Sequence, residues 1–146
     1  MGKIIGFDLG RKSLGIAISD ALLIAAHGYE EFRFEDGAFK KALNRAVDVI
    51  KKENVNEVCI GLPLHMSGEE SDSSRSCRKF ANDLHELLPD IKIELVDERM
   101  TTMIATNRLL EANLSRNKRK EVIDKMSAVV ILESYMNMRS AQNGRK

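Results

Sequence analysis

Three acidic positions stand out in this chain because each lies at the end of an apolar run or on an apolar helix face. Asp8 lies near the end of the first apolar run, and Asp97-Glu98 directly follows a later one. Asp124 lies in the first turn of a C-terminal stretch with helical periodicity that begins at Glu121. A buried carboxylate is costly unless it is paired or bound to a metal. If these groups meet, they repel one another until a hard cation such as Mg²⁺ neutralises them. Two such ions, about 3.5–4 Å apart, are the usual arrangement for hydrolysing a phosphodiester bond.

Each acid also has an ordinary structural explanation. Asp8 could bond to the backbone of the turn at Gly10. Asp124 could complement the positive end of a helix dipole, where acidic residues are favourable. The residues alone leave these alternatives open, and they do not decide whether Asp97 or Glu98 would bind a metal.

The elements that must position these acids follow from the spacing of apolar residues. Two apolar runs joined by Gly10-Arg11-Lys12 predict a β-hairpin, and a third strand follows over Ala26–Glu35. We expect a mobile loop over His65–Ser76 and a polar, basic segment over Asn113–Lys120. The remaining pattern predicts a helix from Asp36 to Lys52, a strand over Val55–Leu62, a helix carrying Phe80, Leu84, Leu87 and Leu88, a strand over Ile91–Val96, and helices over Thr101–Ala112 and Glu121–Met138.

This order predicts an α/β fold with a five-stranded mixed sheet. An antiparallel meander followed by alternating helices and strands gives such a sheet helices on both faces. Ligands then bind at the carboxyl ends of the parallel strands, where the strand order reverses. Asp8 and Asp97-Glu98 both fall at such ends. The small Ser127 and Ala128, three and four residues after Asp124, would let the last helix approach the sheet closely.

Length and composition narrow the class of protein. The 146 residues suit one domain, which we place at residues 1–138, with a flexible tail over 139–146. No apolar run is long enough to span a bilayer and no signal peptide is evident, so we expect a cytoplasmic protein with no membrane partner. The two cysteines suit a reducing compartment, and neither they nor the three histidines show zinc-ligand spacing.

Basic residues gather near the predicted acidic site. The net charge is only +1, so a nucleic-acid partner would have to be bound by local clusters rather than by the charge of the whole chain. Such clusters are also common on ordinary solvated surfaces, and Arg99 could instead pair with Asp97 or Asp20. We predict nucleic-acid contacts at Arg11, Lys12, Arg99, Arg108, Arg116, Lys118, Arg119 and Lys120.

Several segments together resemble the YqgF family, whose members are described as pre-16S rRNA nucleases and as Holliday junction resolvases. The resemblance spans nearly the whole chain and implies a ribonuclease-H-like fold. It implies a catalytic and metal-binding set for Mg²⁺ or Mn²⁺ made of Asp8, Glu98 (rather than Asp97) and Asp124. The chain departs from the family pattern after Leu64, where His65 stands in place of the usual Asn. The segments are Gly6–Gly10 with Gly15 and Asp20, Ile60–Leu64 with Gly68, Asp97-Glu98-Arg99-Met100-Thr101-Thr102, and Asp124 with Ala128.

The leading hypothesis is therefore a metal-dependent nuclease acting on structured RNA or branched DNA. Trimming of pre-16S rRNA ends, with the pre-ribosomal particle as a partner, is the main candidate, and resolution of Holliday junctions is the alternative. A non-catalytic nucleic-acid-binding module of the same fold is a further alternative. Gly6–Gly10 also resembles the phosphate loop of actin-like ATPases, which need two such domains to enclose a nucleotide. The sequence leaves open RNA or DNA, endonuclease or exonuclease, and monomer or homodimer.

Overall fold

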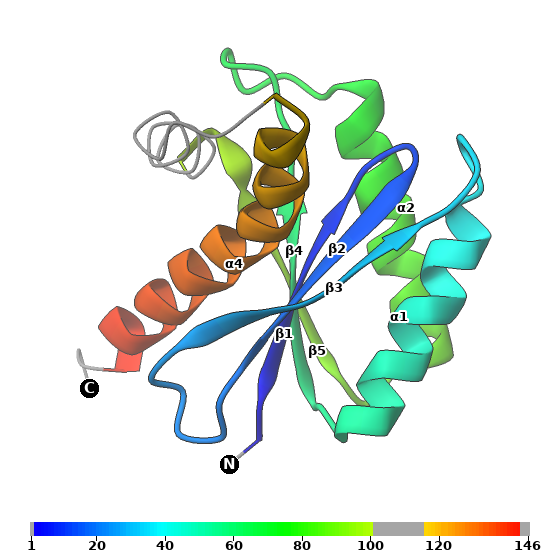
Figure 1. The fold of residues 1–146 in the computed structure, drawn as a ribbon. Coiled ribbons are helices and arrows are strands. Elements are labelled where there is room, and N and C mark those ends of the chain that lie inside the picture. The colour runs from blue at the N-terminus through cyan, green and yellow to red at the C-terminus, as the bar shows by residue number, and fades with distance from the viewer. Residues whose placement is uncertain (1, 101–115, 144–146) are drawn as a thin grey trace.

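The first apolar run forms β1, Ile4–Leu9, the central strand of a five-stranded sheet in the order β3-β2-β1-β4-β5 (Figure 1). β2, Ser13–Ser19, and β3, Ala26–Arg33, continue the sheet on one side with antiparallel pairing. β4, Glu57–Leu62, and β5, Lys92–Asp97, continue it on the other side and run parallel to β1. The predicted mixed sheet is confirmed.

Helices cover both faces of this sheet (Figure 1). α1, Phe39–Glu53, and α2, Asp72–Leu87, pack on one face. α4, Arg116–Asn143, crosses the other face. A short 3-10 turn, η1, Glu98–Met100, comes directly after β5.

The computed structural model describes residues 2–100 and 116–143, with backbone only for Met100, for residues 116–125 and for residues 142–143. The helix expected over Thr101–Ala112 and the predicted contact Arg108 lie outside the described residues. Within the described part, no helix is both long and apolar enough to cross a membrane.

The face under α1 and α2 is filled by large apolar side chains. Ile5, Phe7 and Leu9 alternate along β1 toward this face, as expected for a strand whose side chains point to opposite sides in turn. The rings of Phe7 and Phe80 meet edge to face, with their centroids 6.0 Å apart. This side of the sheet therefore holds the larger core.

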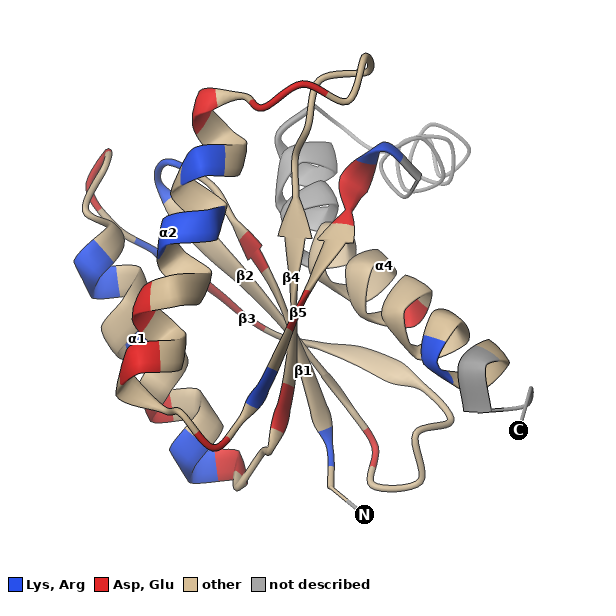
Figure 2. Ribbon diagram, turned by 180° about the vertical axis from the view of Figure 1, so that it is seen from behind, with Lys and Arg blue, Asp and Glu red and all other residues tan. Residues whose placement is uncertain are grey.

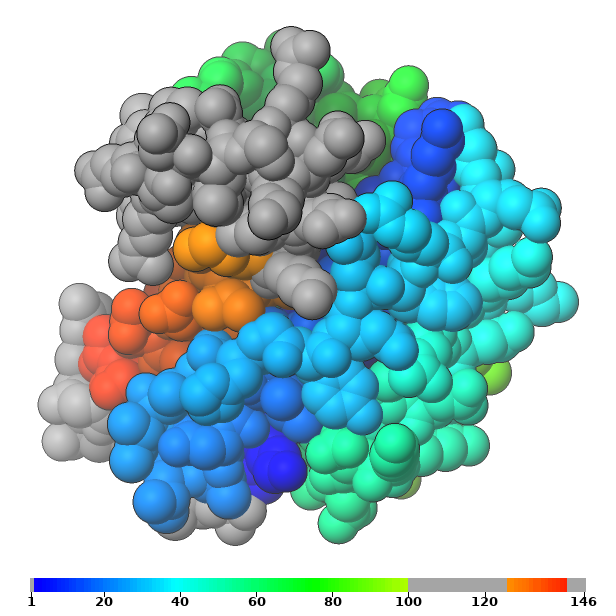
Figure 3. All heavy atoms as spheres, viewed as in Figure 1, coloured from blue at the N-terminus to red at the C-terminus, as the bar shows by residue number. Residues whose placement is uncertain are grey.

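The face under α4 is built from smaller residues. A Cβ atom added to Gly6 would lie 2.9 Å from Cβ of Leu132, so the helix approaches β1 more closely than any side chain at position 6 would allow. Ala17 of β2 and Ala128 of α4 are also fully buried here. In the space-filling view, α4 (orange to red) lies directly against the surface formed by the blue hairpin of β2 and β3 (Figure 3).

The helix α2 begins earlier than the sequence suggested. The expected loop ends at Ser71, because Ser71 caps the helix: its hydroxyl accepts from the Ser74 backbone, and the Ser74 hydroxyl accepts from the Ser71 backbone. The expectation of a loop as far as Ser76 was therefore wrong. Leu87, which we placed on the apolar stripe, is 54% exposed.

The last helix is longer than expected at both ends. It begins at Arg116 rather than Glu121, so the basic residues at positions 116 and 118–120 lie in its first turns rather than in a segment before it. Asp124 consequently lies in the third turn and not the first, which removes the helix-dipole explanation for this acid. The helix continues to Asn143, through most of the expected tail.

Candidate active site

Two of the three predicted acids, Asp8 and Glu98, meet on the α4 side of the sheet. Asp8 follows Ile4 and Gly6 in the alternation that faces α4, and Glu98 comes directly after β5. β4 separates the two strands, and it contributes Gly61 at the crossing point. A Cβ atom added to Gly61 would lie 2.9 Å from Cδ of Glu98. The side chain of Glu98 therefore crosses β4 over this glycine and forms a hydrogen bond with Asp8.

The close approach of the two acids has an electrostatic consequence. Burial raises the pKa of Glu98 to about 8, and the negative charge of Asp8, the hydrogen bond to Asp8 and the charge of Asp97 act in the same direction. Without a cation, the Asp8–Glu98 pair therefore retains a proton at neutral pH. This donor set fits a hard divalent cation, which prefers carboxylate oxygens and would displace that proton.

The neighbouring Asp97 has a different environment. Its carboxylate accepts from Nη2 of Arg99 at 2.6 Å, from Nε at 2.9 Å and from the Arg99 backbone N–H at 3.0 Å. The hydrogen bond from the Arg99 side chain lowers the pKa of Asp97, so this group stays ionised. The structure thus brings Glu98, and not Asp97, to Asp8. It also shows Arg99, a predicted nucleic-acid contact, already paired with Asp97.

The third predicted acid, Asp124, is placed only by its backbone. It lies on α4 one turn before Ala128, which is buried against the sheet. Figure 1 shows that this end of α4 lies at the same end of the sheet as the carboxyl end of β5. Among the described side chains, no group of three or more His, Cys, Asp or Glu residues could hold a metal ion, and Asp124 is outside that set.

A buried thiol lies near the acidic pair without taking part in it. Cys77 of α2 donates a weak hydrogen bond to the Leu9 carbonyl, with 4.0 Å between sulfur and oxygen. Burial, followed by the negative charges of Glu98 and Asp8, raises the pKa of Cys77 to about 12. The thiol is therefore protonated at neutral pH and is not a nucleophile.

The predicted nucleic-acid contacts at Arg11, Lys12 and Arg99 lie at this end of the sheet, after the carboxyl ends of β1 and β5. Arg11 and Lys12 are exposed in the turn after β1, where Nε of Arg11 lies 2.8 Å from Oδ1 of Asp36. Figure 2 shows the charges of this end, with the acidic end of β5 (red) followed at once by a basic residue (blue). The side chains of Arg116, Lys118, Arg119 and Lys120 lie outside the described residues.

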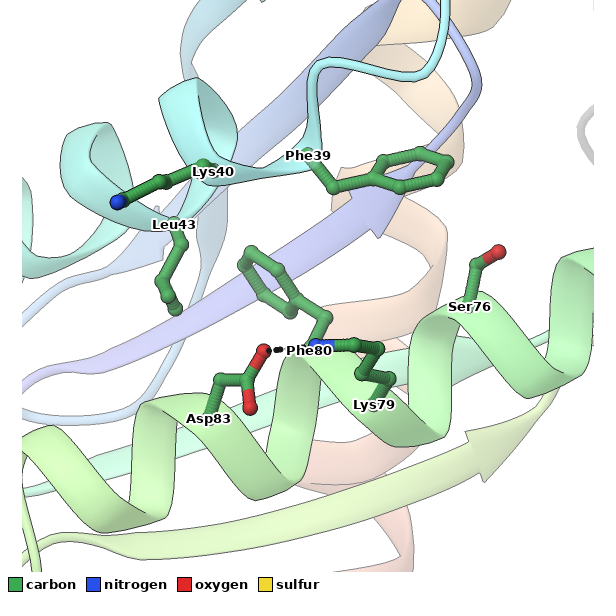
Figure 4. Close-up of a pocket in the computed structure, with 7 residues that line it drawn as sticks. All are labelled: Phe39, Lys40, Leu43, Ser76, Lys79, Phe80 and Asp83. Carbon is green, nitrogen blue, oxygen red and sulfur yellow. Dashed lines mark hydrogen bonds and ion pairs between the residues drawn. The ribbon is translucent and has the colours of Figure 1, made fainter.

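A cavity of about 360 Å³ lies between α1 and α2, on the face of the sheet opposite to α4 (Figure 4). Phe39, Leu43 and Phe80 line it, and Lys79 and Asp83 form an ion pair at its rim. Its lining contains none of the predicted acids, so it is separate from the Asp8–Glu98 pair.

Comparison with known proteins identifies the family. A family model described as "RuvX: Holliday junction resolvase" matches residues 2–138. The chain belongs to the RuvX family. This is the family that the sequence motifs resemble under the name YqgF, so the resemblance is confirmed. The family and the names of its relatives identify the chain as a nuclease, an enzyme that hydrolyses phosphodiester bonds.

Curated relatives match almost end to end. The RuvX-family chain is 41% identical over 135 residues to a Staphylococcus carnosus (strain TM300) protein named "Putative pre-16S rRNA nuclease", covering 92% of this chain and 95% of that protein. A protein of the same name from Oceanobacillus iheyensis is 39% identical over 137 residues, covering 94% and 99% of the two chains.

Solved structures support the fold. The chain is similar to T. thermophilus RuvC in complex with a Holliday junction substrate, with a TM-score of 0.61 and 13% identity over 97% of each chain. It is also similar to the fowlpox virus Holliday junction resolvase, with a TM-score of 0.57 and 12% identity over 93% of this chain and 99% of that one. The predicted ribonuclease-H-like fold is confirmed.

The sequence alone did not identify Gly61 as a residue of the site. Gly61 forms part of the family motif, but its role became clear only from its neighbours: Glu98 on one side and Ile131, whose Cδ1 would lie 2.5 Å from an added Cβ, on the other. A glycine inside a buried strand often marks a close approach by another group. That signal was present in the sequence, although it does not say which group approaches.

Proposed function

We propose that this RuvX-family protein is a divalent-metal-dependent nuclease that trims the ends of pre-16S rRNA in the cytoplasm, with the pre-ribosomal particle as its partner. One observation carries the proposal: Glu98 crosses β4 over Gly61 and shares a hydrogen bond with Asp8. This arrangement places two oxygen donors at the strand ends where ligands of such sheets bind. The names of the curated relatives support pre-16S rRNA as the substrate.

In this proposal Asp8, Glu98 and Asp124 hold Mg²⁺ or Mn²⁺. The bound ion would stabilise the negative charge that develops on the phosphate during hydrolysis. Glu98 must lose its proton when the ion binds. Because the pKa of Glu98 is raised, the affinity for the ion should increase as the pH rises. Basic residues around the site would hold the phosphate backbone on either side of the scissile bond: Arg11, Lys12, Arg108, Arg116, Lys118, Arg119 and Lys120.

The proposal is tested with a pre-16S rRNA fragment that carries its unprocessed ends, incubated with Mg²⁺ or Mn²⁺. We expect Asp8→Asn to lower the cleavage rate by on the order of 10³-fold or more, because it removes one carboxylate of the pair. Asp83→Asn, an acid at the rim of the cavity on the opposite face, is the matched control and should cleave like the wild type. Equal rates for wild type and Asp8→Asn would rule out this mechanism.

A four-way DNA junction digested in parallel tests the alternative substrate. The family description favours this second candidate, since it names a Holliday junction resolvase. Symmetric cutting of the junction, without trimming of the RNA, would make junction resolution the function.

Calorimetry separates both enzymatic functions from a non-catalytic role. A titration with Mn²⁺ should give a saturable heat signal for the wild type and a much smaller one for Asp8→Asn. RNA affinity without any divalent-ion binding would instead indicate a nucleic-acid-binding module of the same fold.

A further inference from the structure

The loop between β4 and α2, residues 63–71, presents an apolar side chain to solvent at the end of the sheet where Asp8 and Glu98 meet. Met66 is 79% exposed. Among the residues that the structure describes, no other large apolar side chain is as exposed. The loop begins two residues after Gly61, the glycine that Glu98 crosses. Binding residues are often carried by loops that a rigid scaffold positions, so this side chain is accessible to a substrate bound at the end of the sheet.

The backbone of Met66 is fixed to the segment that positions Glu98. Nη1 of Arg99, the residue after Glu98, donates to the Met66 carbonyl at 3.3 Å, while the rest of its guanidinium is held by Asp97. The loop is also closed on itself. The Gly68 N–H donates to the His65 carbonyl at 2.8 Å, and Gly68 has a φ of +92°, a conformation that other residues rarely adopt.

The charges of this loop disfavour a phosphate contact. The segment 63–71 contains no Lys or Arg. Glu70 is held by Arg78, with distances of 2.6 and 3.1 Å, and the charge of Arg99 is balanced by Asp97. The loop therefore offers a nucleic acid an apolar contact rather than a cation, and bases rather than phosphates make such contacts.

We propose that Met66 is an apolar wedge that packs against a nucleobase next to the scissile phosphate. Met side chains are used as wedges between bases in other nucleic-acid-binding proteins, and the thioether is flexible and polarisable. Arg99 is the positioning residue that holds the wedge in place. The inference rests on the proposed function, because it requires a nucleic acid bound at the Asp8–Glu98 pair.

The test measures RNA binding in EDTA, so that no cleavage occurs. The probe is an RNA hairpin with a single-stranded extension that carries the fluorescent base 2-aminopurine at one position after another. We expect the wild type to change the fluorescence at one or two adjacent positions. Met66→Ala should lose that change and bind about 3- to 10-fold more weakly, while Met66→Phe should keep both.

Leu22→Ala is the matched control. Leu22 is 70% exposed but lies in the connection of β2 to β3, at the other end of the sheet, so its removal should change neither affinity nor fluorescence. Arg99→Ala should weaken the fluorescence change at the same position as Met66→Ala. The double variant should bind no more weakly than the weaker of the two single variants, because both act through one contact.

Equal affinity and an equal fluorescence change for wild type and Met66→Ala would overturn the inference, as would a wild type that does not bind the RNA. A failure of the proposed nuclease function has a different signature. In that case the protein binds the probe through Met66 in EDTA but cleaves neither RNA nor DNA when Mg²⁺ or Mn²⁺ is added.

Discussion

The two faces of the sheet are built from different kinds of side chains. The face under α1 and α2 is filled by large residues such as Phe7, Leu14 and Phe80. The face under α4 uses glycine at positions 6 and 61, where an added Cβ would collide with the helix or with Glu98. One face stabilises the fold by burying apolar area, while the other gives up side chains so that a helix and a carboxylate can come close.

The difference explains where chemistry is possible. Apolar burial contributes most where large side chains interlock, and that face holds an apolar cavity but none of the predicted acids. On the α4 face, the space left by Gly61 admits the Glu98 side chain, and burial there, followed by the contact with Asp8, raises the pKa of Glu98. The two faces should therefore respond differently to substitution.

The largest expected loss of stability is on the α1 and α2 face. Phe80 is 3% exposed and packs on Phe7, so Phe80→Ala should lower the free energy of unfolding by about 3–5 kcal/mol. Chemical denaturation measures this loss. At denaturant concentrations below the unfolding transition of Phe80→Ala, the cleavage rate per folded molecule should match that of the wild type. A large drop in that rate would show that the two faces are not separable.

A smaller loss of stability, with a larger effect on activity, is expected at Gly61. Gly61→Ala places a methyl group against Ile131 and Glu98, so we expect about 1–3 kcal/mol of destabilisation and a strong loss of cleavage. Gly28→Ala is the matched control, because an added Cβ at Gly28 meets nothing within 4 Å. Thermal unfolding and the cleavage assay measure both effects. Full activity in Gly61→Ala would contradict the role given to this glycine.

The smallest effect is a change in how stability depends on pH. The pKa of Glu98 is about 8 in the folded protein and about 4.3 in the unfolded chain, so between these values the folded state keeps a proton that the unfolded state has lost. In EDTA, stability should therefore fall as pH rises from about 5 to 8. Glu98→Gln should remove this dependence and raise the melting temperature at pH 8 by about 5 °C.

Thermal scans at several pH values measure this dependence. Glu69→Gln, in the exposed part of the β4–α2 loop, is the control and should keep the wild-type dependence. Added Mg²⁺ should flatten the wild-type curve, since the ion favours the deprotonated pair. An identical pH dependence in wild type and Glu98→Gln would show that Glu98 ionises normally.

Periodicity in the sequence was sufficient to predict the elements whose side chains face a core. The alternation along residues 4–9 and the helical spacing after Phe39 both correspond to observed elements, β1 and α1. Element ends were less well predicted where side-chain hydrogen bonds decide them. Ser71 and Ser74 start α2 through a mutual cap, which apolar spacing does not indicate.

By itself, the sequence determined the strand order along the chain, the α/β class and the position of acids at strand ends, because these depend on local patterns of apolar and polar residues. Only the tertiary structure decided which of the adjacent acids, Asp97 or Glu98, reaches Asp8. Neighbouring residues at the end of a strand point to opposite faces, and the partners that fix each one, Arg99 and the space over Gly61, come together only when the strands pair.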